Sequence, residues 1–439
     1  MTATAHPQAP EQSTAEAPAQ LNTDTLAALN TDTLAALNDV RHRGQSWLLA
    51  RQSESGAWTL PLRAGVAMPS VAMTVLALTA LADSGCVPED AIGNGLSWLA
   101  GRQNRDGSFG DGEKGLYYRP YCTALALWVL PNTSARQRKR VAKAVDYLRQ
   151  NQRLAGLNRG GLGFGMVAPA PTAQNPGATF TRTFAMISPT SMAAEGARRV
   201  GIRPDDRFLT EIAHYVRSCH NDARINTRPE VARFLKRNGF RLSGDGGIVS
   251  TLENLRRPAT WTGQSAGSVV SSGISTYQGL SAYLRAGLAP DSPEVASVTR
   301  WIAAHYTVSE HAGFAEVMRA GQRPLWPTEH AGFTPEPAAD ETVSDPAPAD
   351  DIAQAGRYLY LFAMAQALDA VGIDHVDTPD GTRHAWSSEI ANVLTATQHV
   401  DGSWINQNPR WLEFDAVLST AFALAALNII YARRAAAAA

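Results

Sequence analysis

The chain has 439 residues, of which 44% are hydrophobic and 18% are charged, which is the composition of a globular protein with one large domain or two ordinary ones. Its formal net charge of −1 excludes an overall positive field that would attract nucleic acid or an anionic membrane surface. Cys86, Cys122 and Cys219 lie far apart and form no CxxC pair. This spacing argues against a disulfide framework and fits a reducing compartment, so we expect a cytoplasmic protein.

The first 36 residues read as a disordered tail. Residues 1–20 lack the basic start and apolar stretch of a secretory signal, and the unit LNTDTLAA then occurs twice, over 21–28 and 29–36. The longest apolar run, residues 70–82, is shorter than the roughly 20 residues that cross a bilayer, so no integral membrane segment is expected. The predicted domain covers 37–432, and 433–439 is expected to fray.

Helical periodicity dominates the rest of the chain, and two kinds of segment alternate strictly. Amphipathic segments, with charges on one face, occupy residues 38–52, 90–103, 135–152, 205–219, 292–307 and 383–398. Segments that are apolar nearly all round occupy residues 69–85, 121–130, 187–201, 274–288, 355–372 and 416–430. A helix that is apolar on every side must be buried on every side. The pattern therefore predicts an all-α fold, an (α/α)6 barrel with six inner and six outer helices.

One turn recurs between an outer and an inner segment. It reads Gln-x-x-Asp-Gly-Ser-aromatic at 103–109 and 398–404, with a looser copy at 52–58 and a degenerate one after Gln152. The glycine allows a tight reversal, and the aromatic residue is expected to wedge against the neighbouring pair. The fourth and fifth pairs carry long insertions instead, 220–273 and 308–354, which we expect to cover one mouth of the barrel.

This repeated turn resembles the QW motif of squalene-hopene and oxidosqualene cyclases, which is weaker in protein prenyltransferase β-subunits. Four stretches resemble uncharacterised bacterial prenyltransferase and squalene-oxidase repeat proteins. They are GGLGFG (160–165), STYQGLSAYLRAGL (275–288), RYLYLFAMAQALDAVG (357–372) and DGSWINQNPRWLEFDAVLSTAFALAAL (401–427). The resemblance covers roughly residues 40–432. It implies the toroidal fold of class II terpene cyclases, an apolar small-molecule partner such as an isoprenoid, and cyclisation started by protonation.

In that family the acid is the central Asp of a DxDD motif before an inner helix. The nearest match is Pro-Ala-Asp-Asp at 348–351, which makes Asp350 and Asp351 the first candidate acids. Asp415, at the start of the last inner segment, is the second candidate. An alternative interpretation makes Asp415 a helix N-cap whose pKa is lowered by backbone N–H groups.

Aromatic residues near the starts of inner segments are candidates for binding the substrate and its cations. They are Tyr118, Tyr121, Trp261, Tyr277, Tyr358, Tyr360, Trp411 and Phe414. Because Tyr277 lies within a buried run, it also requires a polar neighbour. His311 and His330, in two copies of EHAGF, are expected on the surface of the covering insertion.

No metal or other cofactor is expected from the sequence. Adjacent Cys219 and His220 point in different directions on a helix, unlike the zinc ligands of the protein prenyltransferases. Mg²⁺ would enter only with a diphosphate substrate. Two alternatives to the cyclase stay open: a non-catalytic toroid that binds a lipid or a peptide, and a toroid enzyme of lyase or glycosidase type.

Overall fold

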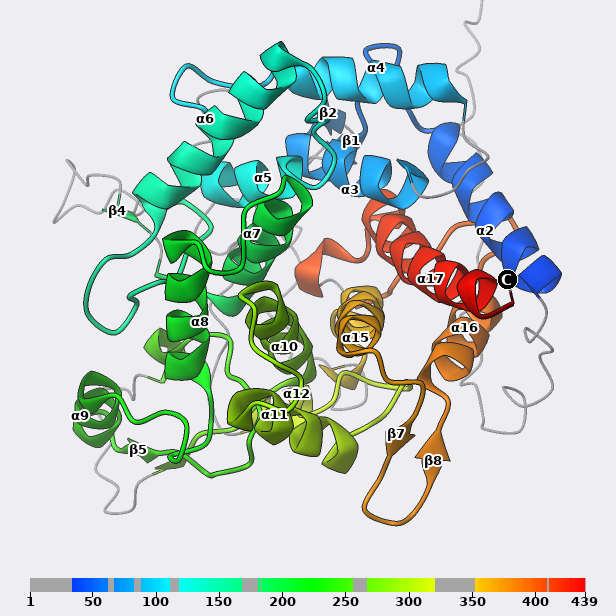
Figure 1. The fold of residues 1–439 in the computed structure, drawn as a ribbon. Coiled ribbons are helices and arrows are strands. Elements are labelled where there is room, and N and C mark those ends of the chain that lie inside the picture. The colour runs from blue at the N-terminus through cyan, green and yellow to red at the C-terminus, as the bar shows by residue number, and fades with distance from the viewer. Residues whose placement is uncertain are drawn as a thin grey trace, which may run out of the picture.

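The computed structural model describes residues 34–61, 67–82, 88–110, 118–167, 181–182, 184–255, 267–319, 352–408 and 410–438. Six of its helices form a closed inner ring. They are α3 (Val71–Ala82), α5 (Arg119–Ala126), α7 (Ile187–Arg199), α10 (Gly273–Arg285), α15 (Arg357–Val371) and α17 (Ala416–Ala438). Each packs against the next in this order, and α17 packs back against α3 (Figure 1).

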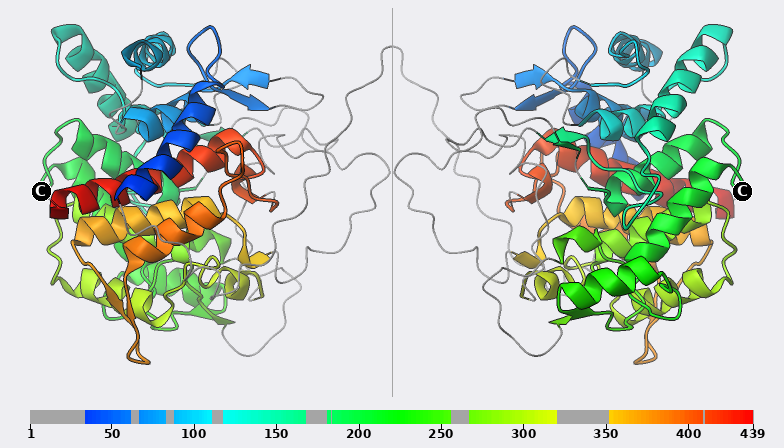
Figure 2. Two further views of the ribbon diagram at one scale, coloured as in Figure 1. Left: turned by 90° about the vertical axis from the view of Figure 1, so that its right-hand side faces the viewer. Right: turned by 90° about the vertical axis from the view of Figure 1, so that its left-hand side faces the viewer.

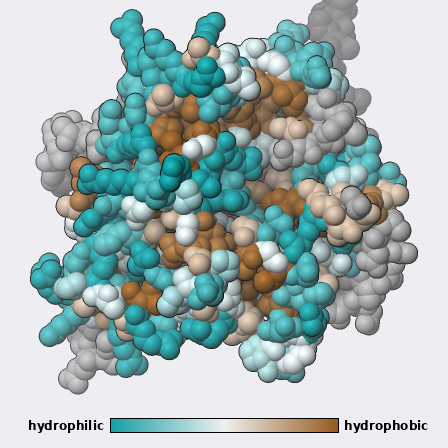
Figure 3. All heavy atoms as spheres, viewed as in Figure 1, coloured by the Kyte–Doolittle hydropathy of each residue, from teal (hydrophilic) through white to brown (hydrophobic). Residues whose placement is uncertain are grey.

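A second set of six helices surrounds this ring. They are α2 (Leu34–Leu49), α4 (Glu89–Ala100), α6 (Ala135–Asn151), α8 (Arg207–Cys219), α11 (Pro293–Ala304) and α16 (Trp386–Ala396). Each packs against one or two inner helices, as α2 does against α17 and α3. The face seen in Figure 1 is mostly hydrophilic, with hydrophobic side chains visible between the helices (Figure 3). The prediction of an all-α fold is confirmed, and the twelve helices correspond to the twelve predicted segments.

Smaller elements fill the connections. The first insertion contains α9 (Pro229–Arg237), η3 (Leu252–Asn254) and strand β5 (Phe240–Arg241), which pairs in parallel with β6 (Gly267–Ser268), and the second contains α12 (Phe314–Arg319). Three antiparallel pairs and one 3-10 turn complete the described elements: β1 (Thr59–Pro61) with β2 (Ala67–Pro69), β3 (Met166–Val167) with β4 (Thr181–Arg182), β7 (Val376–Asp377) with β8 (Arg383–His384), and η4 (Arg410–Leu412). Strands β1 and β2 and the turn before α17 lie at the end of the ring opposite the C-terminus (Figure 2).

The first and last described helices extend beyond residues 37 and 432, the predicted bounds of the domain. Helix α2 begins at Leu34 and so includes the last residues of the second LNTDTLAA copy. Helix α17 continues to Ala438, past the predicted boundary at 432. Arg433 forms ion pairs with Asp369 (3.0 Å) and Asp374 (2.5 Å), which link the last turns of α17 to α15 and to the segment after it.

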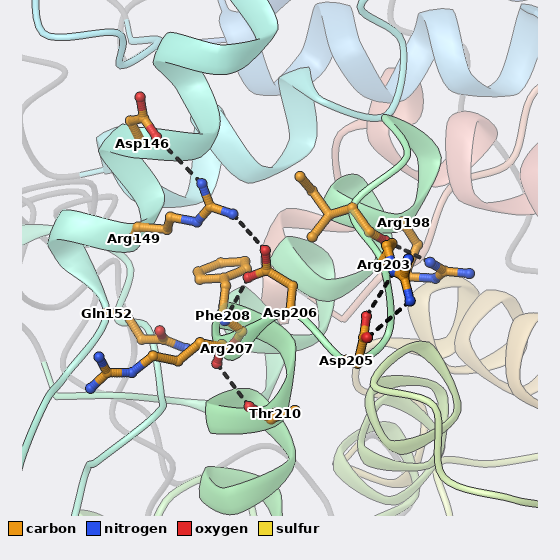
Figure 4. A network of polar contacts seen from close by, with 11 residues as sticks. Asp146, Arg149, Gln152, Arg198, Arg203, Asp205, Asp206, Arg207, Phe208 and Thr210 are labelled. Atoms are coloured by element: carbon orange, nitrogen blue, oxygen red, sulfur yellow. Dashed lines mark hydrogen bonds and ion pairs between the residues drawn. The ribbon is translucent and has the colours of Figure 1, made fainter.

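The glutamine of the repeated turn fastens successive outer helices together. The Gln103 side-chain amide donates to Gly107 O (3.1 Å) in its own turn and to Arg140 O (2.9 Å) in α6. Gln52 and Gln152 make the same pair of bonds to their own turn and to α4 or α8. Figure 4 shows the joint between α6 and α8, where Arg149 also pairs with Asp206 (2.8 Å).

The last glutamine closes the ring. Gln398, after α16, donates to Gly402 O (3.0 Å) and to Val40 O in α2 (2.9 Å). The two joints without glutamine use other polar pairs: Arg217 with Glu294 (2.7 Å) between α8 and α11, and Tyr306 with Glu389 (2.9 Å) between α11 and α16. Every outer helix is thus tied to the following one.

The glycine of the repeated turn is required by both its conformation and its surroundings. Gly107 has a φ of +93°, and a Cβ there would lie 2.2 Å from Lys143 O in α6. Gly402 repeats this geometry, with a φ of +94° and 2.6 Å to Arg43 O in α2. L-residues rarely adopt this φ, and the carbonyl group leaves no space for a side chain. The aromatic residues Trp58, Phe109 and Trp404 of the three turns are fully buried, as expected for a wedge.

Candidate functional site

The inward face of each inner helix can be identified from a recurrent threonine. The backbone N–H of Trp58 in the first turn donates to Thr74 Oγ1 (3.0 Å), and four other turns repeat the bond. The five acceptors are Thr74, Thr123, Thr190, Thr276 and Thr420. These threonines face the turns that lead to the outer layer. Since successive helical residues are about 100° apart, the residue two positions later faces the centre of the ring.

We call the six side chains at this position the inward collar. They are Leu76, Leu125, Met192, Gln278, Phe362 and Phe422; on α15 the position is counted from Tyr360, which replaces the threonine. Ring contacts agree with this assignment. The ring centroid of Phe362 lies 5.8 Å from that of Phe422 and 6.2 Å from that of Trp128, which follows α5 on the opposite side of the helix ring. The collar and Trp128 therefore form a layer across the centre that is partly aromatic and apolar except for Gln278.

Asp415 lies on the inward side, at the end of the ring where the inner helices begin. It precedes Thr420 by five residues and is 7% exposed. Its Oδ1 accepts the N–H of Leu418 (2.9 Å), which is an N-cap bond to α17. Burial nevertheless raises the pKa of Asp415, against the hydrogen bonds from the backbone, which lower it. The expectation that capping lowers this pKa is wrong, because desolvation of the carboxylate is the larger effect.

A second buried acid, Glu413, was not among the candidates from the sequence. Its carboxylate accepts the N–H of Leu359 (2.8 Å) and the side-chain amide of Asn406 (2.7 Å), so it caps α15, whose own cap residue Gly356 has no side chain. Burial raises the pKa of Glu413 to about 7, against those bonds and the charge of Arg357. An acid within the apolar run WLEFD was the available signal.

The predicted aromatic residues separate into groups. Tyr118 and Tyr121 at the start of α5 contact Phe164, with ring centroids 6.1 and 5.1 Å apart. Tyr277 packs against Tyr360, its polar neighbour, with ring centroids 5.7 Å apart. The Tyr360 hydroxyl donates to Thr307 O (2.8 Å) after α11. These two tyrosines therefore lie toward the outer layer.

The remaining candidates lie around the turn before α17 or outside the described residues. Tyr358 is buried, and its hydroxyl donates to Ile405 O (3.4 Å). Trp411 adopts a left-handed conformation (φ 55°) and packs on Phe314 at 5.1 Å. Phe414 is exposed. Three candidates, Asp350, Asp351 and Trp261, lie outside the described residues.

His311 is in the interior rather than on the surface of the insertion, so that expectation is wrong. Its Nε2 accepts the N–H of Ile274 (3.0 Å) in α10, and its Nδ1 contacts Ala355 O (3.1 Å) before α15. Burial lowers the pKa of His311 to about 3, so the ring is neutral at pH 7. It fastens the starts of two inner helices, where its two partners satisfy both ring nitrogens. His330 lies outside the described residues.

Within the described part of the chain, no group of three or more His, Cys, Asp or Glu side chains is arranged to hold a metal ion. Cys219 is a buried free cysteine, and burial raises its pKa to about 12. The adjacent His220 contacts the Tyr283 hydroxyl (3.1 Å). Among the described helices, only α17 is long and apolar enough to cross a membrane, and 67% of its apolar window is buried inside the fold.

No protein-family model and no curated protein matches this chain, whereas several solved structures do. Type II terpene cyclase MstE from Scytonema, in its apo form, is 14% identical with a TM-score of 0.46, over 90% of this chain and 98% of that one. A variant of the same cyclase in complex with its substrate, geranylgeranyl dihydroxybenzoate, has the same identity and TM-score, over 92% of this chain and 99% of that one. A protein from Actinoplanes is 15% identical with a TM-score of 0.42, over 90% of this chain and 99% of that one.

Proposed function

We propose that the closed ring is an (α/α)6 barrel and that the chain is a terpene-cyclase-like enzyme. It binds an isoprenoid at the centre of the ring and starts cyclisation by protonation from Asp415. The observation that carries this proposal is the position of Asp415, a buried acid on the inward side at the end where the inner helices begin. The repeated turn, which resembles the QW motif, supports the same class.

The chemistry needs an acid that keeps its proton until the substrate is bound. Burial of Asp415 favours the protonated form, and the N–H of Leu418 stabilises the carboxylate that remains after transfer. The proton forms a C–H bond with one alkene carbon, the π electrons make that bond, and the positive charge develops on the other carbon. The faces of Phe362 and Phe422 can then stabilise the cation while the apolar members of the collar exclude water.

Asp350 and Asp351 are the second assignment for the acid, from their resemblance to DxDD. The two assignments are separated by incubating the protein with squalene and with farnesyl and geranylgeranyl diphosphates, with and without Mg²⁺, and extracting products for mass spectrometry. A cyclised product that is lost in Asp415→Asn and kept in Asp350→Asn supports Asp415. The opposite result moves the acid to Asp350. Full activity in both variants rejects both.

A second candidate function is a non-catalytic binding toroid. One observation favours it: the carboxylates of Asp415 and Glu413 both accept backbone N–H groups at helix starts, which is also what purely structural caps do. Extraction of an unaltered isoprenoid from the purified protein, without turnover of any substrate, would support this alternative.

A further inference from the structure

The inward collar contains one polar member. Five of the six equivalent positions hold Leu, Met or Phe, and the sixth, on α10, holds Gln278. A glutamine amide in apolar surroundings is costly unless its donors and acceptor are paired. Gln278 is only 5% exposed, so most of its side chain is shielded from solvent.

The hydrogen bonds of Gln278 are incomplete. Its Nε2 lies 3.4 Å from the Ser188 hydroxyl of α7, a long contact, and its amide oxygen accepts no hydrogen bond from any described residue. An amide can donate two hydrogen bonds and accept two. The unused capacity of Gln278 is directed toward the centre of the ring, because this is the inward position of the helix.

Neighbouring hydroxyl groups extend this polarity along α10. Ser275 lies three residues earlier on the same face and contacts the Ser272 hydroxyl (3.2 Å). The inward face of α10 thus presents Ser272, Ser275 and Gln278, whereas α15 presents Leu359 and Phe362 at the last two corresponding positions. Among the six collar positions, α10 supplies the one polar side chain, and that side chain carries no charge.

We propose that Gln278 is a specificity-determining residue that binds a neutral oxygen function, a hydroxyl or a carbonyl, on the ligand at the centre of the ring. The inference rests on the proposed isoprenoid-binding function and narrows its substrate class to oxygenated isoprenoids. A pure hydrocarbon leaves the amide unpaired. A diphosphate brings several negative charges to a collar that offers no cation to balance them.

The test measures equilibrium binding to the full chain by extraction and mass spectrometry. The probes are geranylgeraniol, the hydrocarbon that lacks its hydroxyl, and geranylgeranyl diphosphate. The variant is Gln278→Leu, which gives α10 the residue type found at two other collar positions and so favours a folded protein. The matched control is Gln45→Leu, the same change at a buried glutamine of the outer helix α2.

The wild type is expected to bind the alcohol about tenfold more tightly than the hydrocarbon, the effect of one added hydrogen bond in a buried site. Gln278→Leu abolishes this preference, and Gln45→Leu keeps it. The inference is overturned if the wild type binds neither the alcohol nor the hydrocarbon, or binds both equally. It is also overturned if the preference survives in Gln278→Leu, or if the diphosphate binds most tightly and does so through Gln278. Turnover is scored separately: preference without product rejects the cyclase alone, and product without preference rejects the role of Gln278 alone.

Discussion

Replacing Gln398 by Ala opens the joint that closes the ring. The change removes two hydrogen bonds to backbone carbonyl groups, Val40 O and Gly402 O. At about 0.5–1.5 kcal/mol each, their loss lowers the free energy of unfolding by about 2 kcal/mol. The bonds from Arg43 to the Gln398 amide oxygen are exposed and add little.

Hydrogen exchange read by mass spectrometry is the suitable assay, because the effect is local. A loss of about 2 kcal/mol speeds exchange about 30-fold for amides that open with the joint. The increase is expected in α2 and at the end of α16, while α7 and α10 keep their protection. Gln52→Ala removes the equivalent bonds to Gly56 O and Ala91 O and should move the increase to the joint between α2 and α4.

The control is Gln150→Ala, on the exposed face of α6, which is expected to change neither exchange nor melting temperature. Unchanged protection of α2 in Gln398→Ala would refute the idea that this side chain closes the ring. An equal increase around the whole ring would refute the local form of the argument, since it would mean that the helix pairs open only together.

Three further predictions concern single residues. Asp415→Asn should lower turnover by at least about 100-fold while the far-UV circular dichroism is kept, because the amide cannot transfer a proton but can still accept the Leu418 N–H. For Glu413, the folded pKa of about 7 exceeds the ordinary value, so ionisation destabilises the fold progressively as pH rises from about 4.5 to 7. Denaturant titrations at pH 5, 6, 7 and 8 should show the stability of the wild type falling relative to Glu413→Gln, by up to about 3 kcal/mol; a wild type that gains stability over this range contradicts the raised pKa. Gly107→Ala should destabilise the protein by more than about 1 kcal/mol, because its Cβ meets Lys143 O, whereas Gly93→Ala, with open space around it, should be neutral or slightly stabilising in the same thermal melts.

The twelve helices were predictable because their hydrophobic patterns are long and regular. The short pairs β1–β2 and β7–β8 have two or three residues a strand, too few for a period of two to stand out. Helix α9 lies in an insertion that the sequence marked only as a long connection. Its strongly amphipathic sequence was a usable signal, but it fell outside the repeat on which the prediction was built.

The repeated turn was predicted from the sequence, but the hydrogen bonds by which its glutamine joins two outer helices were not. The sequence shows that Gln103 recurs with Gly107, yet its second partner, Arg140 O, lies 37 residues later. Pairings of this kind depend on how successive helices lie, which local patterns do not encode. The same limitation hid the burial of His311, which contacts both α10 and the residues before α15.

The candidate site was predictable only in part. Asp415 was identified from its place before the last inner segment, but the direction of its pKa shift depends on burial that only the packed ring creates. Gln278 looked like one polar residue among many in an otherwise buried helix. It becomes distinctive only after the threonines define the inward face and the six equivalent positions can be compared.

The bond between Gln398 and Val40 joins residues that are 358 positions apart, and this has a consequence for biosynthesis. While a ribosome is still making the second half of the chain, α2 has neither α16 nor α17 to pack against. Its buried residues, such as Leu37 and Trp47, stay uncovered until translation has passed the last inner helix. The ring can close only then, so the nascent chain spends most of its synthesis with an unpaired apolar edge that chaperones can bind.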